Sequence, residues 1–290
     1  MAGSRLAVTG STGRLGGRVA NRLADAGIAQ RLILRDPTRA PRLDAADVVR
    51  AEYGDGAAAR RALDGVTILF MVSGAEAPDR VDQHRSFVDA AVAAGVEHLV
   101  YVSFYGAAPD ATFTLARDHW ATEEHIRATG LRWTFLRDNL YMDFIPAMVG
   151  ADGTLRGPAG DGRVAAVAQD DIADVAAAVL GRPSTHEGAT YDLTGPEALS
   201  LVEIAETLSR AAGRTVRYVP ETIDEAYASR ATYGAPDWQV DAWVSTYTAI
   251  AAGEVSGVSD VVDRIAGHAP TSLHALLASR RDQLSLGMPL

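Results

Sequence analysis

Val8-Thr9-Gly10-Ser11-Thr12-Gly13-Arg14-Leu15-Gly16 lies close to the start of the 290-residue chain and sets the expectation for the whole fold. The preceding segment, Arg5 to Thr9, is predicted to be a short buried strand. The segment Leu15 to Ala26 has apolar residues at helical spacing and ends before Gly27. The glycines are therefore expected in a turn from a strand to a helix, the context in which such a motif binds a dinucleotide.

Each glycine has a physical reason in such a turn. Gly10 allows a tight turn, Gly13 lets backbone N–H groups approach a pyrophosphate, and Gly16 lets the helix pack closely on the strand. The start of the helix adds unpaired N–H donors and the positive end of its dipole. A plain surface loop is the alternative. The residues predicted to bind the dinucleotide here are Gly10, Ser11, Thr12, Gly13, Arg14 and Leu15.

The second predicted strand, Arg31 to Arg35, leads to two residues of opposite charge that can read the ribose of the dinucleotide. Asp36 lies at the usual distance for an acid that bonds a ribose 2′-hydroxyl, whereas Arg35 can hold a 2′-phosphate. The nearby Arg39 and Arg42 favour Arg35, and therefore NADP over NAD. The alternative is that these arginines only form a solvated loop.

The composition excludes several classes of function. The chain has 27 basic and 37 acidic residues and a net charge of −10, without a basic patch, which argues against nucleic acid and anionic membranes as partners. The apolar runs are too short to span a bilayer and no signal-peptide pattern is seen, so we expect a soluble cytoplasmic protein. Cysteine is absent and every basic residue is arginine, which excludes thiolate, iron–sulfur and lysine Schiff-base chemistry. The seven histidines are scattered, so no metal site is expected.

Strands and helices alternate along the first half of the chain. Further strands are predicted at 48–52, 66–72, 98–102 and 131–136, and helices at 80–94 and 114–129. This alternation implies parallel strands with right-handed crossovers, that is, an α/β fold with a Rossmann-like doubly wound sheet. Ligands of such sheets bind outside the carboxyl ends of the strands, and candidate residues follow these ends at Asp55, Ser73, Gly74, Ser103 and Asn139. His84, on the helix 80–94, is expected at the surface.

Beyond Tyr141 the pattern changes. Residues 150–162 hold five glycines and are expected to form an irregular crossing segment. A helix at 171–180 and a strand at 190–193 are expected to rejoin the sheet, and a capping box, Ser200-x-x-Glu203, begins another helix. A short strand at 216–219 is followed by helical pieces, one of which, 237–254, has an apolar face that includes Trp243 and Tyr247. We expect this face to pack in a core, with lining of a pocket as the alternative. The predicted domains are a dinucleotide-binding lobe, 1–140 with 164–194, and a smaller substrate lobe, 141–163 with 195–290.

A set of motifs spread over nearly the whole chain resembles the NmrA-like atypical short-chain dehydrogenase/reductases. Within that family the chain is most similar to the type 2 NAD(P)H:quinone oxidoreductases and the triphenylmethane reductases. The resemblance implies a Rossmann lobe, a small, mostly helical C-terminal lobe, and a nicotinamide held in the cleft between them. It also implies an NAD(P)H-dependent oxidoreductase that acts on a small molecule, as a monomer or homodimer. The motifs are Val8 to Gly16, Arg35-Asp36-Pro37, Val102-Ser103-Phe104, His119 to Glu123, Thr134 to Asn139, Tyr141 to Phe144 and the helix 237–254.

The chain departs from ordinary short-chain dehydrogenases at their Tyr-x-x-x-Lys pair. Aligned on Glu123 and Gly130, those two positions are Leu115 and His119, and the branch that the chain resembles lacks the pair too. Hydride addition to a ketone makes an alkoxide whose conjugate acid has a pKa of about 16, so a proton must be supplied. Addition to a quinone makes a phenolate, with a conjugate acid near ~10, and a cationic dye needs no proton. We therefore expect NADPH-dependent transfer of hydride to a flat conjugated acceptor such as a quinone.

Three polar residues remain to orient a substrate or supply a proton, namely Ser103, His119 and Tyr141. Ser103 can instead bond the backbone at the end of its strand, and His119 can simply pack on its helix. For Tyr141 we favour a lid residue that stacks on the nicotinamide over an acid. The alternative function is a non-catalytic NAD(P)-sensing regulator, and an epimerase or dehydratase ranks last because it would normally need the Tyr–Lys pair.

Overall fold

The computed structural model describes residues 5–280, which form two compact units. Within these residues, the first unit contains 5–109, 118–137 and 169–192, and the second contains 110–117, 138–168 and 193–280.

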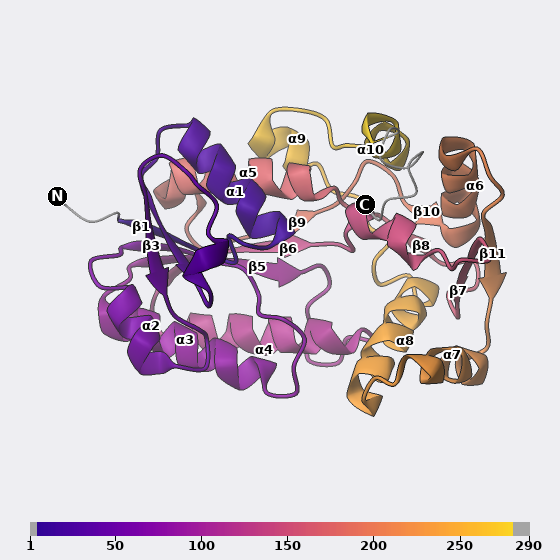
Figure 1. The fold of residues 1–290 in the computed structure, drawn as a ribbon, viewed down its shortest axis with the longest axis horizontal. Helices are drawn as coiled ribbons and strands as arrows, with labels where there is room; N and C mark the ends of the chain where they lie inside the picture. The colour runs from indigo at the N-terminus through magenta and orange to yellow at the C-terminus, as the bar shows by residue number, and fades with distance from the viewer. Residues whose placement is uncertain (1–4, 281–290) are drawn as a thin grey trace. The chain divides into compact units, whose positions relative to one another are not determined.

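A seven-stranded, mostly parallel sheet forms the centre of the first unit (Figure 1), in the order β3-β2-β1-β4-β5-β6-β9. β1 lies between β2 and β4 and is parallel to both, so the chain runs outward to one edge and then returns to the other side of β1. This reversal is the switch point at which open α/β sheets bind ligands. The predicted Rossmann-like doubly wound sheet is confirmed. The strands are β1 (Leu6–Thr9), β2 (Gln30–Leu34), β3 (Ala46–Arg50), β4 (Ile68–Met71), β5 (His98–Phe104), β6 (Arg132–Asp138) and β9 (Ala189–Leu193).

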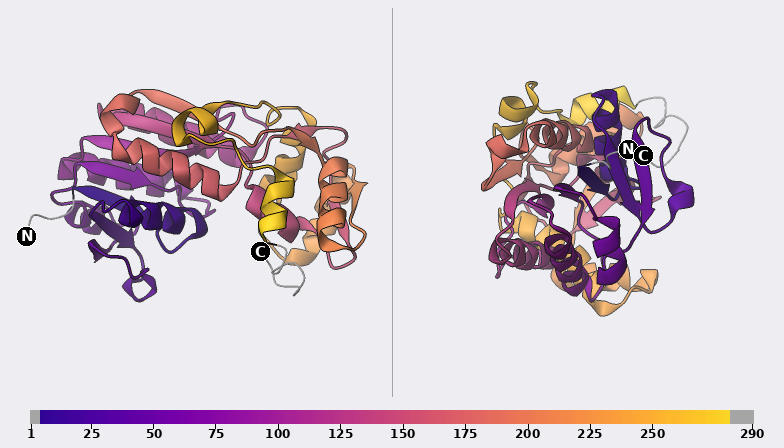
Figure 2. Two further views of the ribbon diagram at one scale, coloured as in Figure 1. Left: turned by 90° about the horizontal axis from the view of Figure 1, so that it is seen from above. Right: turned by 90° about the vertical axis from the view of Figure 1, so that its left-hand side faces the viewer.

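Helices cover both faces of this sheet, α1 and α5 on one face and α2, α3 and α4 on the other (Figure 1). α1 and α5 lie side by side along their face when the molecule is seen from above (Figure 2). The core under α2 and α3 contains fully buried Leu69, Phe87, Leu99 and Phe135. The helices are α1 (Arg14–Asp25), α2 (Gly56–Ala62), α3 (Arg80–Ala94), α4 (Thr114–Ala128) and α5 (Gln169–Gly181), and short 3₁₀ turns form η1 (Pro37–Arg39) and η3 (Pro183–His186).

The predicted elements of this unit agree with the structure to within about two residues at their ends, and three further findings differ from the expectations. α3 begins and ends where the sequence predicts it. β5 continues to Phe104, so Ser103 lies inside the strand rather than after it. α2 was not predicted, because its run of alanine and arginine shows no apolar periodicity. His84 was expected at the surface, but this expectation is wrong because its side chain is completely buried.

The second unit is mostly helical and holds two small two-stranded sheets. The prediction of an irregular segment at 150–162 is wrong over part of its length, because β7 pairs in parallel with β11, about sixty residues later. The glycines there allow close packing. A Cβ atom at Gly157 would lie 2.2 Å from the ring of Tyr247, and one at Gly162 would lie 2.2 Å from the carbonyl oxygen of Ile250. The elements are η2 (Met142–Met148), β7 (Thr154–Gly157), β8 (Arg163–Val164), β10 (Leu199–Ser200), α6 (Leu201–Ala212), β11 (Arg217–Pro220), α7 (Ile223–Arg230), η4 (Ala231–Tyr233), α8 (Asp237–Ala251), α9 (Val261–Ala266) and α10 (Leu273–Ser279).

Two local predictions for the second unit are confirmed. Ser200 and Glu203 form the predicted capping box at the start of α6. On α8 the predicted apolar face is buried at Tyr247 and half-buried at Trp243. Between residues 5 and 280, no helix combines the length and apolar character needed to cross a membrane.

Candidate active site

The glycine turn after β1 contains two glycines that the fold itself requires. Gly10 has a φ of +67°, in the left-handed region where other residues are strained. A Cβ atom at Gly16 would lie 2.3 Å from the carbonyl oxygen of Gly10, which is a collision. Gly10 thus serves the tight turn, and Gly16 serves the close packing of α1 on β1.

Gly13 has no comparable structural reason to be glycine. Its φ of −88° suits any residue, and a Cβ atom there would lie 3.2 Å from the carbonyl oxygen of Gly10. Thr12, Gly13 and Arg14 are exposed at the tip of the turn, so a side chain at position 13 would project where a ligand can approach.

The surroundings of Gly13 fit the pyrophosphate of a dinucleotide. The Ser11 hydroxyl is buried, and among residues 5–280 it has no hydrogen-bond partner. The first turn of α1 has no acidic residue and no side-chain cap, so nothing within the helix compensates the positive end of its dipole. Leu15 is buried behind this turn and anchors it. A donor without a partner, a positive helix start and an open backbone are together what an anionic phosphate needs.

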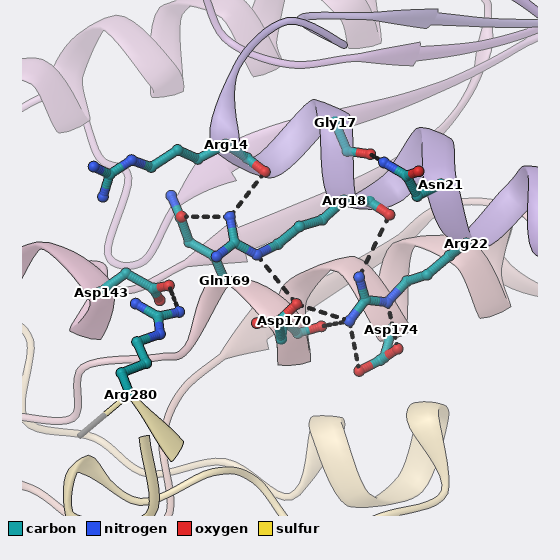
Figure 3. Close-up of polar contacts among 10 residues, drawn as sticks. All are labelled: Arg14, Gly17, Arg18, Asn21, Arg22, Asp143, Gln169, Asp170, Asp174 and Arg280. Atoms are coloured by element: carbon teal, nitrogen blue, oxygen red, sulfur yellow. Dashed lines mark hydrogen bonds and ion pairs between the residues drawn. The ribbon is translucent and has the colours of Figure 1, made fainter. Parts of the chain in front are cut away.

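Arginines fix α1 to α5 on the same face of the sheet (Figure 3). The Arg22 guanidinium donates to Asp174 over 2.6 Å and to Asp170 over 3.0 Å. Arg18 donates through Nε to the same oxygen, Oδ1 of Asp170, over 3.1 Å. These ion pairs hold the helix whose first residues form the glycine turn.

Arg35 and Asp36 follow β2 and are both exposed. The Asp36 carboxylate accepts hydrogen bonds from the Thr38 amide at 3.0 Å and the Thr38 hydroxyl at 2.6 Å. These bonds hold the pKa of Asp36 below its usual value. Asp36 therefore caps its own turn, which leaves Arg35 as the residue whose charge can meet a 2′-phosphate.

Asp55 and Gly74 follow β3 and β4, which are consecutive in the chain but separated by β2 and β1 in the sheet. The exposed Asp55 caps α2, because its carboxylate accepts the amide of Ala58 at 2.9 Å. Ser73 is half-buried and begins the turn after β4. This turn adjoins the glycine turn, since a Cβ atom at Gly10 would lie 3.0 Å from the Val72 Cβ.

Two side chains of α3 bind the backbone of Gly74. The Gly74 amide donates to Nε2 of His84 at 2.8 Å, and Nε of Arg80 donates to the Gly74 carbonyl at 3.0 Å. Nε2 of His84 is therefore unprotonated and its hydrogen lies on Nδ1, which donates to the Thr122 hydroxyl at 2.9 Å. Burial, and secondarily the charge of Arg80, lower the pKa of His84 to about 3. His84 is a neutral acceptor.

His119 is buried and has the same protonation pattern. Arg80 donates to its Nε2 at 3.1 Å, so the single hydrogen of the neutral ring lies on Nδ1, 3.1 Å from the Tyr101 hydroxyl. Burial, with the charge of Arg80 as the next cause, holds the pKa of His119 well below its ordinary value. The ring stands 6.1 Å from that of Phe104, beside the end of β5.

Ser103 is completely buried, and its hydroxyl donates to Oε1 of Glu123 at 2.6 Å. The Glu123 carboxylate is also completely buried and is bridged by Arg137, at 2.6 Å, and Arg127, at 3.0 Å. The hydroxyl hydrogen of Ser103 is thus committed to a carboxylate inside the unit.

Asn139 and Tyr141 belong to the second unit. The Asn139 amide group donates to the Val255 carbonyl at 3.0 Å and accepts from the Leu140 amide at 2.7 Å. Tyr141 is half-buried and bridges to Val167 immediately before η2. The next acidic residue, Asp143, is buried and pairs with Arg280 (Figure 3).

Sequence reasoning missed Arg80 and its link to His84. Both residues lie on the buried stripe of α3, because position 80, position 84, the pair 87 and 88, and position 91 are spaced three or four residues apart, about one helical turn. The signal was present in the sequence as polar residues in register with Phe87 and Ala91. The two polar residues were not predicted to be buried because only apolar residues were assigned to the buried face of this helix.

Comparison with known proteins agrees with this fold and motif set. The model of the NmrA-like family matches residues 2–231. The chain belongs to the NmrA-like family. The predicted family is therefore confirmed.

Three relatives cover this NmrA-like chain almost completely. The NAD(P)H azoreductase of Xenophilus azovorans is 34% identical over 90% of the chain and 92% of its own length. The NADPH-dependent quinone oxidoreductase QOR2 of Escherichia coli, solved with NADPH, is 32% identical over 94% of the chain and 99% of its own, with a TM-score of 0.87. The triphenylmethane reductase of Citrobacter sp., solved with NADP(H), is 31% identical over 94% of the chain and 99% of its own, with a TM-score of 0.83.

Proposed function

We propose that this NmrA-like protein is an NADPH-dependent oxidoreductase that passes hydride to a conjugated acceptor such as a quinone, without an acid supplied by the protein. The broader assignment, an NAD(P)H-dependent oxidoreductase, rests on relatives that are quinone, azo and triphenylmethane reductases. The choice of NADPH is supported by solved relatives with NADPH or NADP(H) bound and by the exposed positive charge of Arg35.

Bound NADPH supplies the hydride. The Ser11 hydroxyl and the start of α1 would hold its pyrophosphate, and Arg35 its 2′-phosphate. Asp55, Ser73, Gly74 and Asn139 remain proposed cofactor contacts. Of these, Asp55 and Asn139 already bond the chain itself, so we assign their side chains chiefly to shaping the backbone.

The acid-free part of the proposal is carried by one observation, the hydrogen bonds of His119. Nε2 accepts from Arg80, and the hydrogen on Nδ1 is directed at the buried hydroxyl of Tyr101. With its pKa held well below the ordinary value, His119 has no acidic hydrogen to give a substrate at neutral pH. The hydroxyl of Ser103 is engaged with Glu123 in the same way. We therefore assign positioning roles to both residues.

Tyr141 is the remaining polar candidate, and we assign it to placing the nicotinamide or the substrate ring rather than to acid catalysis. Tyr141→Phe keeps the ring and removes the hydroxyl, so kcat should stay within a few-fold of the wild type. Tyr141→Ala should raise KM for the acceptor at least as much as it lowers kcat, because an interaction that places the substrate is lost. A large loss of kcat in Tyr141→Phe alone would instead identify the hydroxyl as an acid.

The test of the function is a panel of acceptors mixed with NADPH and followed by nicotinamide absorbance. Quinones and cationic dyes should be reduced and saturated ketones should not, because only the ketone product, with a conjugate acid near ~16, needs a proton during the transfer. If no acceptor is reduced and NADP and NAD bind equally well, the protein is a dinucleotide sensor.

The role of His119 is tested by kcat for one good quinone as a function of pH. His119→Ala should cost less than the roughly 10²–10⁴-fold expected for loss of a general acid. His125→Ala, at a partly exposed histidine of the same helix that pairs with Asp89, is the matched control. A fall of kcat above neutral pH that is present in the wild type and absent only in His119→Ala would show that His119 donates the proton.

A further inference from the structure

We propose that Arg80 and His84 are positioning residues that hold the Ser73–Gly74 turn, through both polar backbone groups of Gly74, in the shape in which it receives the cofactor. The inference rests on the proposed function, because it assigns these side chains to a turn at the cofactor edge of the sheet.

The backbone from Val72 to Gly74 is held largely by side chains. The Val72 amide donates to the Thr9 hydroxyl at 2.9 Å, and the Val72 carbonyl accepts from the hydroxyl of Tyr53. The Gly74 amide and carbonyl are bound by His84 and Arg80, as described above. Four backbone groups next to the glycine turn thus depend on side chains from three other segments.

Arg80 connects this turn to α4. The residue is only 5% exposed, and its guanidinium donates to Gly74, to Asp118 at 3.4 Å and to His119 at 3.1 Å. A guanidinium presents several donors in a fixed plane, so one side chain can set the distance between the turn and α4. A lysine has a single ammonium group on a flexible stem and cannot reach all three acceptors in the same geometry.

Gly74 itself is adapted to these partners. A Cβ atom at this position would lie 3.2 Å from Nε2 of His84 and 3.4 Å from the ring of Tyr53. The absence of a side chain lets the imidazole reach the amide.

The first measurement is amide hydrogen exchange of the cofactor-free protein over residues 72–76. His84→Leu removes the acceptor of the Gly74 amide, whereas His84→Gln places a carbonyl oxygen close to the same point. We expect faster exchange of the Gly74 amide in His84→Leu and partial protection in His84→Gln. His125→Leu removes another bond between α3 and α4 without touching the turn, and should leave this exchange unchanged.

The second measurement is steady-state kinetics with NADPH and one quinone. Leaving a buried polar group without its partner should raise KM for NADPH roughly tenfold in His84→Leu and in Arg80→Met, with a smaller effect on kcat. His84→Gln should recover most of the affinity, and Arg80→Lys little of it. Arg85→Met removes an exposed arginine of the same helix and should behave as the wild type.

The outcomes separate this inference from the proposed function. One outcome is that the wild type oxidises NADPH, while His84→Leu and Arg80→Met have the wild-type KM for NADPH and the wild-type amide exchange rates over residues 72–76. The positioning role would then be overturned and the proposed function would stand. If the only change in both variants is a lower melting temperature, and the folded protein binds the cofactor with wild-type affinity, the two residues serve stability alone and the inference is also wrong. If the wild type itself binds no NADPH, the proposed function fails, while the exchange experiment still reports on the turn.

Discussion

At the scale of single residues, Arg35 and Asp36 show how neighbours of opposite charge acquire different tasks. The carboxylate of Asp36 accepts the amide of Thr38 and so caps the η1 turn. Arg35 remains exposed beside it. We therefore expect Arg35, rather than Asp36, to meet the ribose of the cofactor through its 2′-phosphate.

Arg35→Ala should raise KM for NADPH tenfold or more and leave KM for NADH nearly unchanged. A charge-assisted hydrogen bond to a phosphate contributes roughly 1.5–3 kcal/mol, and only NADPH carries the 2′-phosphate. The measurement is kcat/KM for both cofactors, with Arg60→Ala on the exposed side of α2 as a control for the loss of one positive charge. Equal losses for NADPH and NADH would contradict the assignment and point to Asp36.

At the scale of elements, the turn from β1 to α1 places different demands on its glycines. Gly16 is required by packing, since a Cβ atom there would collide with the carbonyl oxygen of Gly10. Gly13 is only tight against the same oxygen, at 3.2 Å. A substitution at each position should therefore fail for a different reason.

Gly13→Val should give a folded protein that binds neither NADPH nor NADH, because its side chain occupies the space of the pyrophosphate. Gly16→Ala should instead lower the melting temperature, because α1 must move away from β1. Cofactor titration and thermal unfolding of both variants separate the two effects. A folded Gly13→Val protein with normal affinity would place the dinucleotide elsewhere.

At the scale of the whole molecule, buried neutral histidines couple the stability of the first unit to pH. Burial is the main cause that lowers the pKa of His84 on α3, His98 on β5 and His119 on α4. The unfolded chain binds a proton at each below a pH of about 6.5, whereas the folded protein does not until a lower pH, about 3 for His84. The stability that these neutral histidines contribute is fully present above pH 6.5. It decreases as the pH falls from the pKa of the unfolded chain towards the lower pKa of the folded protein.

The free energy of unfolding should therefore decrease between pH 6.5 and pH 5, by up to ~1.4 kcal/mol per pH unit for each buried histidine. The carboxyl groups whose pKa is raised by burial, Asp118 and Asp192, act in the opposite direction, because the folded protein then binds more protons at these groups than the unfolded chain. Urea denaturation at several pH values measures the slope. His84→Gln should reduce the slope by the amount that corresponds to about one bound proton, whereas His125→Gln should leave the slope unchanged. A free energy of unfolding that does not change with pH in the wild type would show that these rings are charged in the folded protein.

The sequence alone determined the alternation of strands and helices in the first unit, apart from α2, as well as the class of fold and the glycine turn. These features depend on short-range patterns, because helical and strand periodicity, glycine spacing and capping each involve residues that are close together in the sequence. The family resemblance was also readable, since its motifs are local. The buried face of α3 is also a short-range pattern. Arg80 and His84 could have been predicted on it if polar residues as well as apolar ones had been counted at its positions.

Only the tertiary structure decided which polar groups are already occupied. His119 looks available in the sequence, yet Arg80, 39 positions earlier, takes its acceptor nitrogen. Ser103 looks free at the end of a strand, yet Glu123 accepts its hydrogen. β7 likewise exists only because β11 lies beside it, in a segment that seemed irregular by composition. Hydrogen bonds and strand pairs between distant segments form when folding brings both partners together, so neither partner's local sequence records them.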